Sequence, residues 1–192
     1  MFLLDTTITQ FVFQLIPHNL FFNYFFSFFS LQGNSFFIWI LIIAIIIIIE
    51  EIHQPGTQKT DINFIFYFLI SFIAASSLVN FVLKPIFHRP RPPLGVWKLE
   101  IGNWKLNNRC PNDYSFPSSH AATAFAAACV IAAFDKKRRW FYWGVAFLIS
   151  LSRIYLGCHY FFDVLAGAVL GYLISIILLR FVHETFPSRR RS

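Results

Sequence analysis

The sequence has few charged residues for its length. Only 13% of its 192 residues are Asp, Glu, Lys or Arg, whereas soluble domains average about 25%. Hydrophobic residues make up 57% of the chain and aromatic residues 20%, more than a soluble domain of this size carries. This composition excludes an ordinary soluble or disordered chain and predicts an integral membrane protein.

Cysteine is also scarce. Cys110, Cys129 and Cys158 form neither an even set nor a Cys-x-x-Cys pair, so we expect no metal site. Cys110 and Cys158 fall on one membrane face in the topology derived below, which permits a disulfide, but we predict three unpaired thiols. Residues 1–5 lack the basic region of a secretory signal peptide and no cleavage site follows, so we expect nothing to be removed.

The net charge of +7 would indicate nucleic acid as a partner in a soluble protein. In a membrane protein, basic residues more often set the topology or bind anionic head groups. We therefore expect membrane lipids and a lipid phosphate as partners, and no nucleic acid. The sequence does not indicate the oligomeric state.

Long apolar runs predict an all-α, polytopic membrane helix bundle with one domain over residues 1–192. Five runs are expected to span: 34–52, 62–83, 118–134, 140–156 and 160–182. Residues 11–29 are apolar enough for a sixth span, but Pro17 and neighbouring polar residues interrupt them. For residues 1–33 we favour a helix or helix pair in the membrane interface over a first span. The prediction is five or six transmembrane helices, with a polar-motif core at 62–182.

The polar stretches between these runs fall on one membrane face by parity. The span 62–83 ends at the long polar connection 84–117, the next span leaves from that face, and the following span returns to it near Ser152. Lys and Arg are divided almost evenly between the two faces. The dense basic segments 136–139 and 189–191 lie on the opposite face, which the positive-inside rule assigns to the cytoplasm. We therefore expect the face that carries the motifs to lie outside the cytoplasm.

The hairpin at 152–163 places ionisable residues between two spans, where they are costly unless they serve a site. His159 and Asp163 are four residues apart, so on a helix the carboxylate can hold one imidazole nitrogen and free the other. An oriented histidine is a nucleophile, a base or a metal ligand. Arg153, on the other limb, offers planar donors that suit a phosphate-like anion.

Two further motifs carry polar groups to the same face. Lys84 and Arg91 are separated by a proline-containing stretch, which is typical of a stiff, extended, non-helical segment. Taken alone, this motif is equally typical of a basic juxtamembrane loop. Ser118, Ser119 and His120 follow Pro117 at an expected helix start, where backbone N–H groups and the helix dipole favour an anion. The plainer interpretation of this second motif is an ordinary serine cap.

Taken in order, the motifs read Lys-x6-Arg-Pro, Pro-Ser-x-His and Ser-Arg-x5-His-x3-Asp. Together they resemble the type 2 phosphatidic acid phosphatase superfamily, integral membrane lipid phosphatases that share a site with vanadium haloperoxidases. The resemblance covers roughly residues 62–182. Ser119 stands where the family usually has glycine; a serine can supply the same backbone N–H on a helix but would be strained at positive φ, and we expect a helix.

The resemblance implies a role for each motif residue. His159 would attack phosphorus, Asp163 would fix its tautomer, and His120 would protonate the leaving group. The phosphate would be held by Lys84, Arg91, Ser118, Ser119 and Arg153. No metal or other cofactor is implied.

The implied activity is hydrolysis of a lipid phosphate or diphosphate, of the prenyl diphosphate (undecaprenyl diphosphate among them), phosphatidylglycerophosphate or phosphatidate class. The expected location is a bacterial cytoplasmic membrane with the site facing outward. Two alternatives stay open: transfer of the phosphoryl group to another lipid or to a sugar, and lipid binding without catalysis. The motifs do not select the head group or the tail.

Overall fold

The computed structural model describes residues 2–30, 34–53, 59–93 and 110–185, and these contain helices and no strands. The helices are α1 (Phe2–Leu15), α2 (Leu20–Ser30), α3 (Asn34–His53), α4 (Lys59–Ser77), α5 (Lys84–Phe87), α6 (Ser119–Phe134), α7 (Arg139–Tyr155) and α8 (Phe161–Thr185). A π-helical turn, Leu78–Leu83, joins α4 to α5, and a 3₁₀ turn, Lys136–Arg138, joins α6 to α7. The prediction of an all-α fold is confirmed for the described residues.

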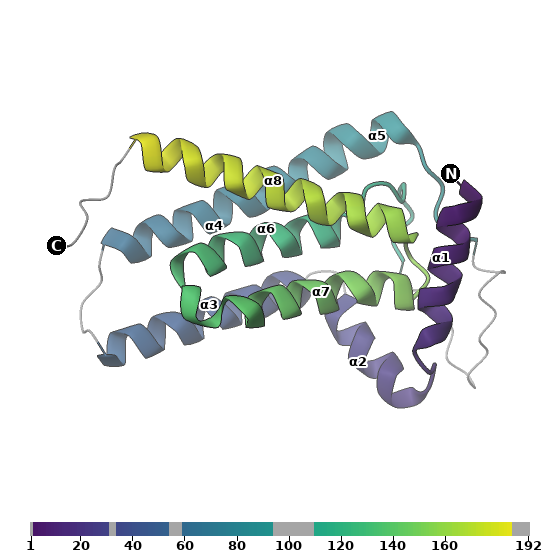
Figure 1. The fold of residues 1–192 in the computed structure, drawn as a ribbon, viewed down its shortest axis with the longest axis horizontal. Helices are drawn as coiled ribbons and strands as arrows, with labels where there is room; N and C mark the ends of the chain where they lie inside the picture. The colour runs from purple at the N-terminus through teal and green to yellow at the C-terminus, as the bar shows by residue number, and fades with distance from the viewer. Residues whose placement is uncertain (1, 31–33, 54–58, 94–109, 186–192) are drawn as a thin grey trace.

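Helix α6 is the centre of the bundle and packs against α4, α7 and α8, while α1 crosses one end (Figure 1). Small residues make this packing close. A Cβ added at Gly171 of α8 would lie 1.9 Å from the carbonyl oxygen of Ala122, and one at Gly167 would lie 2.4 Å from that of Ser118. Glycines at this spacing let two helix backbones approach. The first turn of α6 is thereby held against α8, and the Ser118 N–H donates to the carbonyl oxygen of Asp163 at 2.9 Å.

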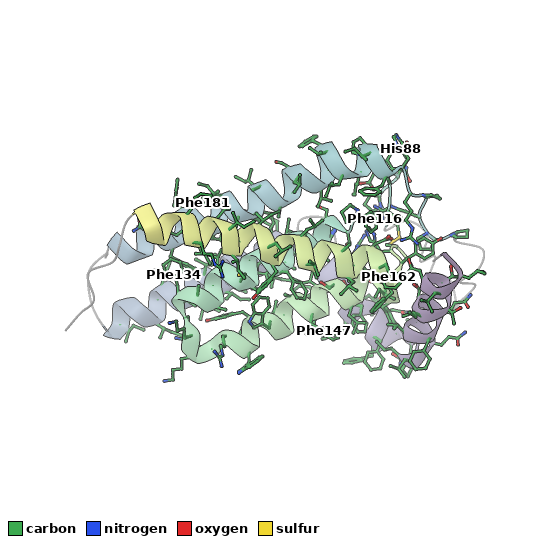
Figure 2. The ribbon with its side chains drawn as sticks, turned by 45° about the horizontal axis from the view of Figure 1, so that its top comes forward. His88, Phe116, Phe134, Phe147, Phe162 and Phe181 are labelled. Carbon is green, nitrogen blue, oxygen red and sulfur yellow. A yellow bond between two sulfur atoms is a disulfide. The ribbon has the colours of Figure 1, made fainter. Side chains whose placement is uncertain are left out.

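Large apolar side chains fill the rest of the bundle. The largest fully buried members of the main cluster come from α3, α4, α6 and α7: Trp39, Phe68, Ile131, Tyr142 and Ile149. In Figure 2, Phe134 and Phe181 lie toward one end of the bundle and Phe116 and Phe162 lie near the other, where the polar motifs gather. The core therefore lies between the motif end and the opposite end of the bundle.

Two helical stretches of the described residues are long and apolar enough to cross a membrane, Asn63–Phe87 and Phe161–Phe181. A third is obtained if α2 and α3 count as one span. Helix α6 has 16 residues, only about 24 Å at 1.5 Å per residue, against a hydrocarbon core of about 30 Å. The membrane helix bundle is supported, but the expected five or six spans are not confirmed.

The N-terminal segment is a helix pair. The apolar run 11–29 does not form one helix, because α1 ends at Leu15 and α2 begins at Leu20, on either side of Pro17. Proline lacks the N–H that a continuous helix needs. This agrees with the helix-pair interpretation of residues 1–33, while the position of the pair in the membrane interface stays a prediction.

All three motifs meet at one end of the bundle, as the parity argument predicts. Helix α5, the start of α6 and the hairpin between α7 and α8 lie together there, beside α1 (Figure 1). Of the long polar connection, residues 94–109 lie outside the described residues. Its two ends, 88–93 and 110–117, are irregular, as expected from their prolines, and run side by side, since the Ser115 N–H donates to the carbonyl oxygen of Arg89 at 2.8 Å.

Candidate active site

The turn after α7 fixes the position of His159. Gly157 has a φ of 67°, the left-handed conformation that glycine adopts at helix ends without steric cost. The N–H groups of Cys158 and His159 then donate to the carbonyl oxygen of Arg153 at 3.0 and 3.2 Å. This closed turn buries His159, whose exposed fraction is 1%.

The two nitrogens of the His159 ring face different groups. Nδ1 lies 3.5 Å from Oδ2 of Asp163, and Nε2 lies 3.0 Å from Nη1 of Arg91. Burial, together with the positive charges of Arg91, Arg153 and Lys84, lowers the pKa of His159 well below its ordinary value. The imidazole is therefore neutral at pH 7, and its Nε2 is directed toward the cations of the first motif.

Lys84 and Arg91 converge on a residue that motif analysis did not select, Asp113. Lys84 follows the π-helical turn, a distortion that often occurs at functional sites. Its ammonium and the Arg91 Nη2 both donate to the Asp113 carboxylate, and Arg91 Nε donates to the Asp113 carbonyl oxygen at 2.9 Å. Burial opposes ionisation of Asp113, but the hydrogen bonds from Lys84 and Arg91 outweigh it and lower its pKa to about 2.

The second motif opens α6 as expected. Ser118 is the residue before the helix, with an extended backbone at φ −73°, and Ser119 is the first helical residue. Ser119 is thus not at positive φ, in agreement with the expectation of a helix. Its hydroxyl accepts a hydrogen bond from Nδ2 of Asn80 at 3.1 Å, so the side chain of Ser119 is held by the π-helical turn.

Five of the eight predicted site residues line one cavity of about 250 Å³. They are Lys84, Arg91, Ser119, His120 and His159. Phe36 of α3 and Phe72 of α4 line the same cavity, so its lining combines cations with aromatic rings. A polar head group and an apolar tail could both find a surface here.

The other three predicted residues are buried beside this cavity: Ser118, Arg153 and Asp163 each have 0% exposure. Arg153 Nη1 donates to the Ser30 carbonyl oxygen at 2.9 Å and to the Ser30 hydroxyl. Among the described residues, no hydrogen-bond partner exists for Arg153 Nε and Nη2 or for the Ser118 hydroxyl. Buried donors without partners are costly and rare in native proteins. An anion at the site would satisfy them.

Three further polar residues belong to this network although motif spacing did not identify them: Asp5, Asn80 and Arg89. Asp5 and Arg89 contact Asp163 or its helix from behind the cavity. Arg89 had a weak signal, because it lies two residues before Arg91 in the first motif. Asp5 had none, since it is 158 positions from Asp163 in the chain. In the described part of the chain, no cluster of three or more His, Cys, Asp or Glu is arranged to hold a metal ion.

Cys110 and Cys158 form a disulfide, and the prediction of three unpaired thiols is therefore wrong. Only Cys129, buried in α6, is free. The prediction failed because the sequence cannot show that the segment before α6 returns to the α7–α8 hairpin. The disulfide fixes the segment that carries Asp113 beside the turn that carries His159.

Comparison with known proteins gives consistent matches. The family model of the PAP2 superfamily matches residues 65–187. Undecaprenyl-diphosphatase from Sulfolobus acidocaldarius is 28% identical over 85% of this chain and 71% of that protein. Lipid A 4'-phosphatase from Bacteroides thetaiotaomicron is 29% identical over 80% of this chain and 67% of that protein. The crystal structure of Aquifex aeolicus LpxE matches with a TM-score of 0.61 and 26% identity, over 92% of this chain and 95% of that chain. Other curated matches span as little as 37% of the relative's length.

Proposed function

The chain belongs to the PAP2 superfamily, and we propose that it hydrolyses a lipid phosphate or lipid diphosphate through a phosphohistidine intermediate. The observation that carries this proposal is the shared cavity of His159, His120, Lys84 and Arg91. A neutral, oriented imidazole, a second histidine and two cations are the groups that phosphoryl transfer to an enzyme nucleophile requires.

In the first step, His159 Nε2 attacks phosphorus and the bond from phosphorus to the lipid oxygen breaks. Asp163, 3.5 Å from Nδ1, stabilises the positive charge that the ring acquires. His120, which takes up a proton when the phosphate anion binds beside it, donates that proton to the departing oxygen. In the second step, His120 removes a proton from water, the water oxygen bonds to phosphorus, and the bond from phosphorus to Nε2 breaks to release inorganic phosphate.

The phosphoryl oxygens would be held by Lys84, Arg91 and Arg153. Arg153 is fully buried and retains two donor nitrogens without partners among the described residues, so an anion would gain full hydrogen bonds at small cost in reorganisation. The Ser118 hydroxyl and the backbone N–H of Ser119 lie at the start of α6, where the helix dipole also favours an anion. These positive charges supply the electrostatic stabilisation that charge redistribution in the transition state demands.

The cavity and the relatives support a proposal for the substrate class. Phe36 and Phe72, which line the same cavity as the cations, would contact the first part of a lipid tail. Two relatives are named for undecaprenyl diphosphate and lipid A, which share a phosphate on a large apolar anchor. We therefore propose a membrane lipid that carries a phosphate or a diphosphate as the substrate.

We propose that α3, the α4–α5 unit, α6, α7 and α8 cross a bacterial cytoplasmic membrane with the motif end facing outward. The disulfide of Cys110 and Cys158 at that end favours an oxidising compartment. The basic turn Lys136–Arg138 lies at the other end of the bundle, between α6 and α7, where the positive-inside rule favours the cytoplasm.

Phosphate release by the purified full-length protein in detergent, with a chelator present, tests this proposal. We expect chelator-resistant release from one class in a panel of prenyl diphosphates, phosphatidylglycerophosphate, phosphatidate and lipid A. In sealed right-side-out vesicles, the same lipid in the outer leaflet should be hydrolysed. Turnover that needs an added lipid or sugar acceptor would indicate a transferase. If no lipid is hydrolysed and no phosphohistidine forms, the result would favour lipid binding without catalysis.

Asp113 should compete with the substrate phosphate. Its carboxylate occupies Lys84 and Arg91, the two cations that the phosphate needs, and its pKa of about 2 keeps it ionised at any working pH. We expect Asp113→Asn to lower the inhibition constant of inorganic phosphate by about 10-fold, because a neutral amide binds both cations less tightly than a carboxylate does. Asn112→Ala is the neighbouring control. A weaker inhibition by phosphate in Asp113→Asn would show instead that Asp113 orders the cations for binding.

A further inference from the structure

Arg89 joins two buried carboxylates behind the cavity. Its Nη1 donates to Oδ1 of Asp163 at 2.6 Å and its Nη2 donates to Oδ2 of Asp5 at 2.5 Å. The side chains of Asp5 and Asp163 are 2% and 0% exposed. The guanidinium also lies over the Tyr160 ring, 4.2 Å from its centroid. Arg89 is therefore directed away from the phosphate cations and toward the residue that orients His159.

Asp5 belongs to α1, and it contacts the start of α8 as well as Arg89. Its Oδ1 accepts a hydrogen bond from the Phe162 N–H at 3.0 Å, and the hydroxyl of Thr9, one turn later, accepts from the Phe161 N–H at 2.9 Å. Helix starts carry N–H groups without intrahelical partners. Residues of α1 thus cap α8 from another helix, at the turn that contains Asp163.

This geometry leaves one oxygen of Asp163 for the nucleophile. Arg89 takes Oδ1, while Oδ2 accepts from the Tyr160 N–H at 2.9 Å and faces His159 Nδ1. We propose that Asp5 and Arg89 are positioning residues that act on His159 through Asp163, so that α1 is part of the catalytic machinery. This inference rests on the proposed function for its kinetic consequences and on the contacts above for its geometry.

The charges of Asp5, Arg89 and Asp163 predict opposite shifts of the His159 pKa in two variants. Asp5, Arg89 and Asp163 together carry a net charge of −1 beside His159. Asp5→Asn makes this charge 0, Arg89→Gln makes it −2, and the double variant restores −1. A negative neighbour stabilises the imidazolium, so the pKa of His159 should fall in Asp5→Asn, rise in Arg89→Gln and return in the double variant.

The other charged and titratable groups around His159 are unchanged in these variants: Lys84, Arg91, Asp113, His120 and Arg153. Their contribution to the His159 pKa is therefore common to all proteins in the comparison. Each single shift should be on the order of half a pH unit at intermediate effective dielectric, because each variant changes one charge that reaches His159 only across Asp163.

The test uses the full-length protein and two readouts. The first is the rate at which diethyl pyrocarbonate modifies His159 as a function of pH, followed by mass spectrometry of its peptide, because the reagent attacks the neutral ring. The second is the acid limb of the pH profile of kcat/KM for the best lipid. We expect both to move to lower pH in Asp5→Asn and to higher pH in Arg89→Gln, and to return in the double variant.

The kinetic constants should separate positioning from binding. Neither Asp5 nor Arg89 lines the cavity, so we expect kcat of each single variant to fall by about 10- to 100-fold, as for other residues that orient a catalytic ligand, with KM within twofold. Thr9→Val is the matched control, because it removes the other α1 cap of α8 without changing charge. It should lower thermal stability and leave the His159 titration in place.

Two results would overturn the inference. One is a His159 titration that is the same in the wild type and both single variants. The other is a shift in the same direction in Asp5→Asn and Arg89→Gln, which would mean that both variants merely loosen the fold. If the modification profiles shift as expected but no lipid is hydrolysed by the wild type, the positioning network stands and the proposed function fails.

Discussion

Replacing His159 with alanine is expected to abolish phosphate release, with a loss in kcat on the order of 10⁶-fold, as when the nucleophile of a cooperating catalytic set is removed. Nε2 of His159 faces Arg91 inside the cavity, while its Nδ1 lies 3.5 Å from the Asp163 carboxylate. Among the described residues, His159 is the histidine that lies this close to a carboxylate. A variant without the imidazole therefore has no route to the covalent intermediate.

The same variant should keep its binding site. Lys84, Arg91 and Arg153 remain, so inorganic phosphate should bind His159→Ala with an affinity within a few-fold of the wild type. His88→Asn is a suitable control, because His88 is an exposed histidine near the motifs and adopts φ 45°, which asparagine tolerates. Turnover by His159→Ala within 10-fold of the wild type would exclude the phosphohistidine mechanism.

Local spacing was sufficient to predict which motif residues lie close together. The i, i+4 relation of His159 and Asp163 brings their side chains together at the start of α8. The helix start at Ser119 follows from the preceding proline and serine. Parity of the apolar runs then predicted that the three motifs share one end of the bundle. These inferences use only neighbouring residues or the count of membrane crossings. None of them depends on how the helices pack.

Contacts between distant segments could not be predicted in the same way. Asp113 reaches Lys84 across 29 positions, and Asp5 reaches Arg89 across 84. The disulfide of Cys110 with Cys158 joins residues 48 positions apart. In the sequence, Asp113 looks like any acidic residue in a loop and Asp5 like any acidic residue on an apolar helix. Each cysteine likewise looks unpaired, because no local pattern indicates its partner. Their partners are set by the close packing of α6 and α8 and by the way α1 crosses the motif end.

The count of spans shows the limit of apolar runs as evidence. The predicted ends of the later runs agree with α6, α7 and α8 to within a few residues, but the length of α6 falls short of a hydrocarbon core. An apolar run identifies a buried helix equally well when protein, rather than lipid, surrounds it. Six buried alanines on α6 show that its neighbours are mainly other helices: Ala121, Ala122, Ala124, Ala126, Ala127 and Ala128.

Replacing His120 with alanine is expected to have the second largest effect, and one that depends on the leaving group. His120 lines the cavity beside His159 and would protonate the departing oxygen. With a lipid monophosphate as substrate, the leaving group is a strongly basic alkoxide, so loss of the acid should lower the rate of phosphohistidine formation by about 10²- to 10⁴-fold. With a lipid diphosphate, the leaving group is the lipid monophosphate, whose pKa is about 6. This leaving group needs little protonation at pH 7.

With a diphosphate substrate, His120→Ala should instead slow the second step. Water then lacks a base, so the phosphorylated enzyme should accumulate, and single-turnover experiments with mass spectrometry should find phosphate on His159. Thr123→Val is the matched control: Thr123 lines the same cavity, but its hydroxyl bonds to the Ser119 carbonyl oxygen at 2.9 Å and is not free for the substrate. Equal slowing of phosphohistidine formation with both substrates would contradict the role of His120 as the acid. Slow phosphohistidine formation with the monophosphate, together with accumulation of the phosphorylated enzyme with the diphosphate, would assign both proton transfers to His120.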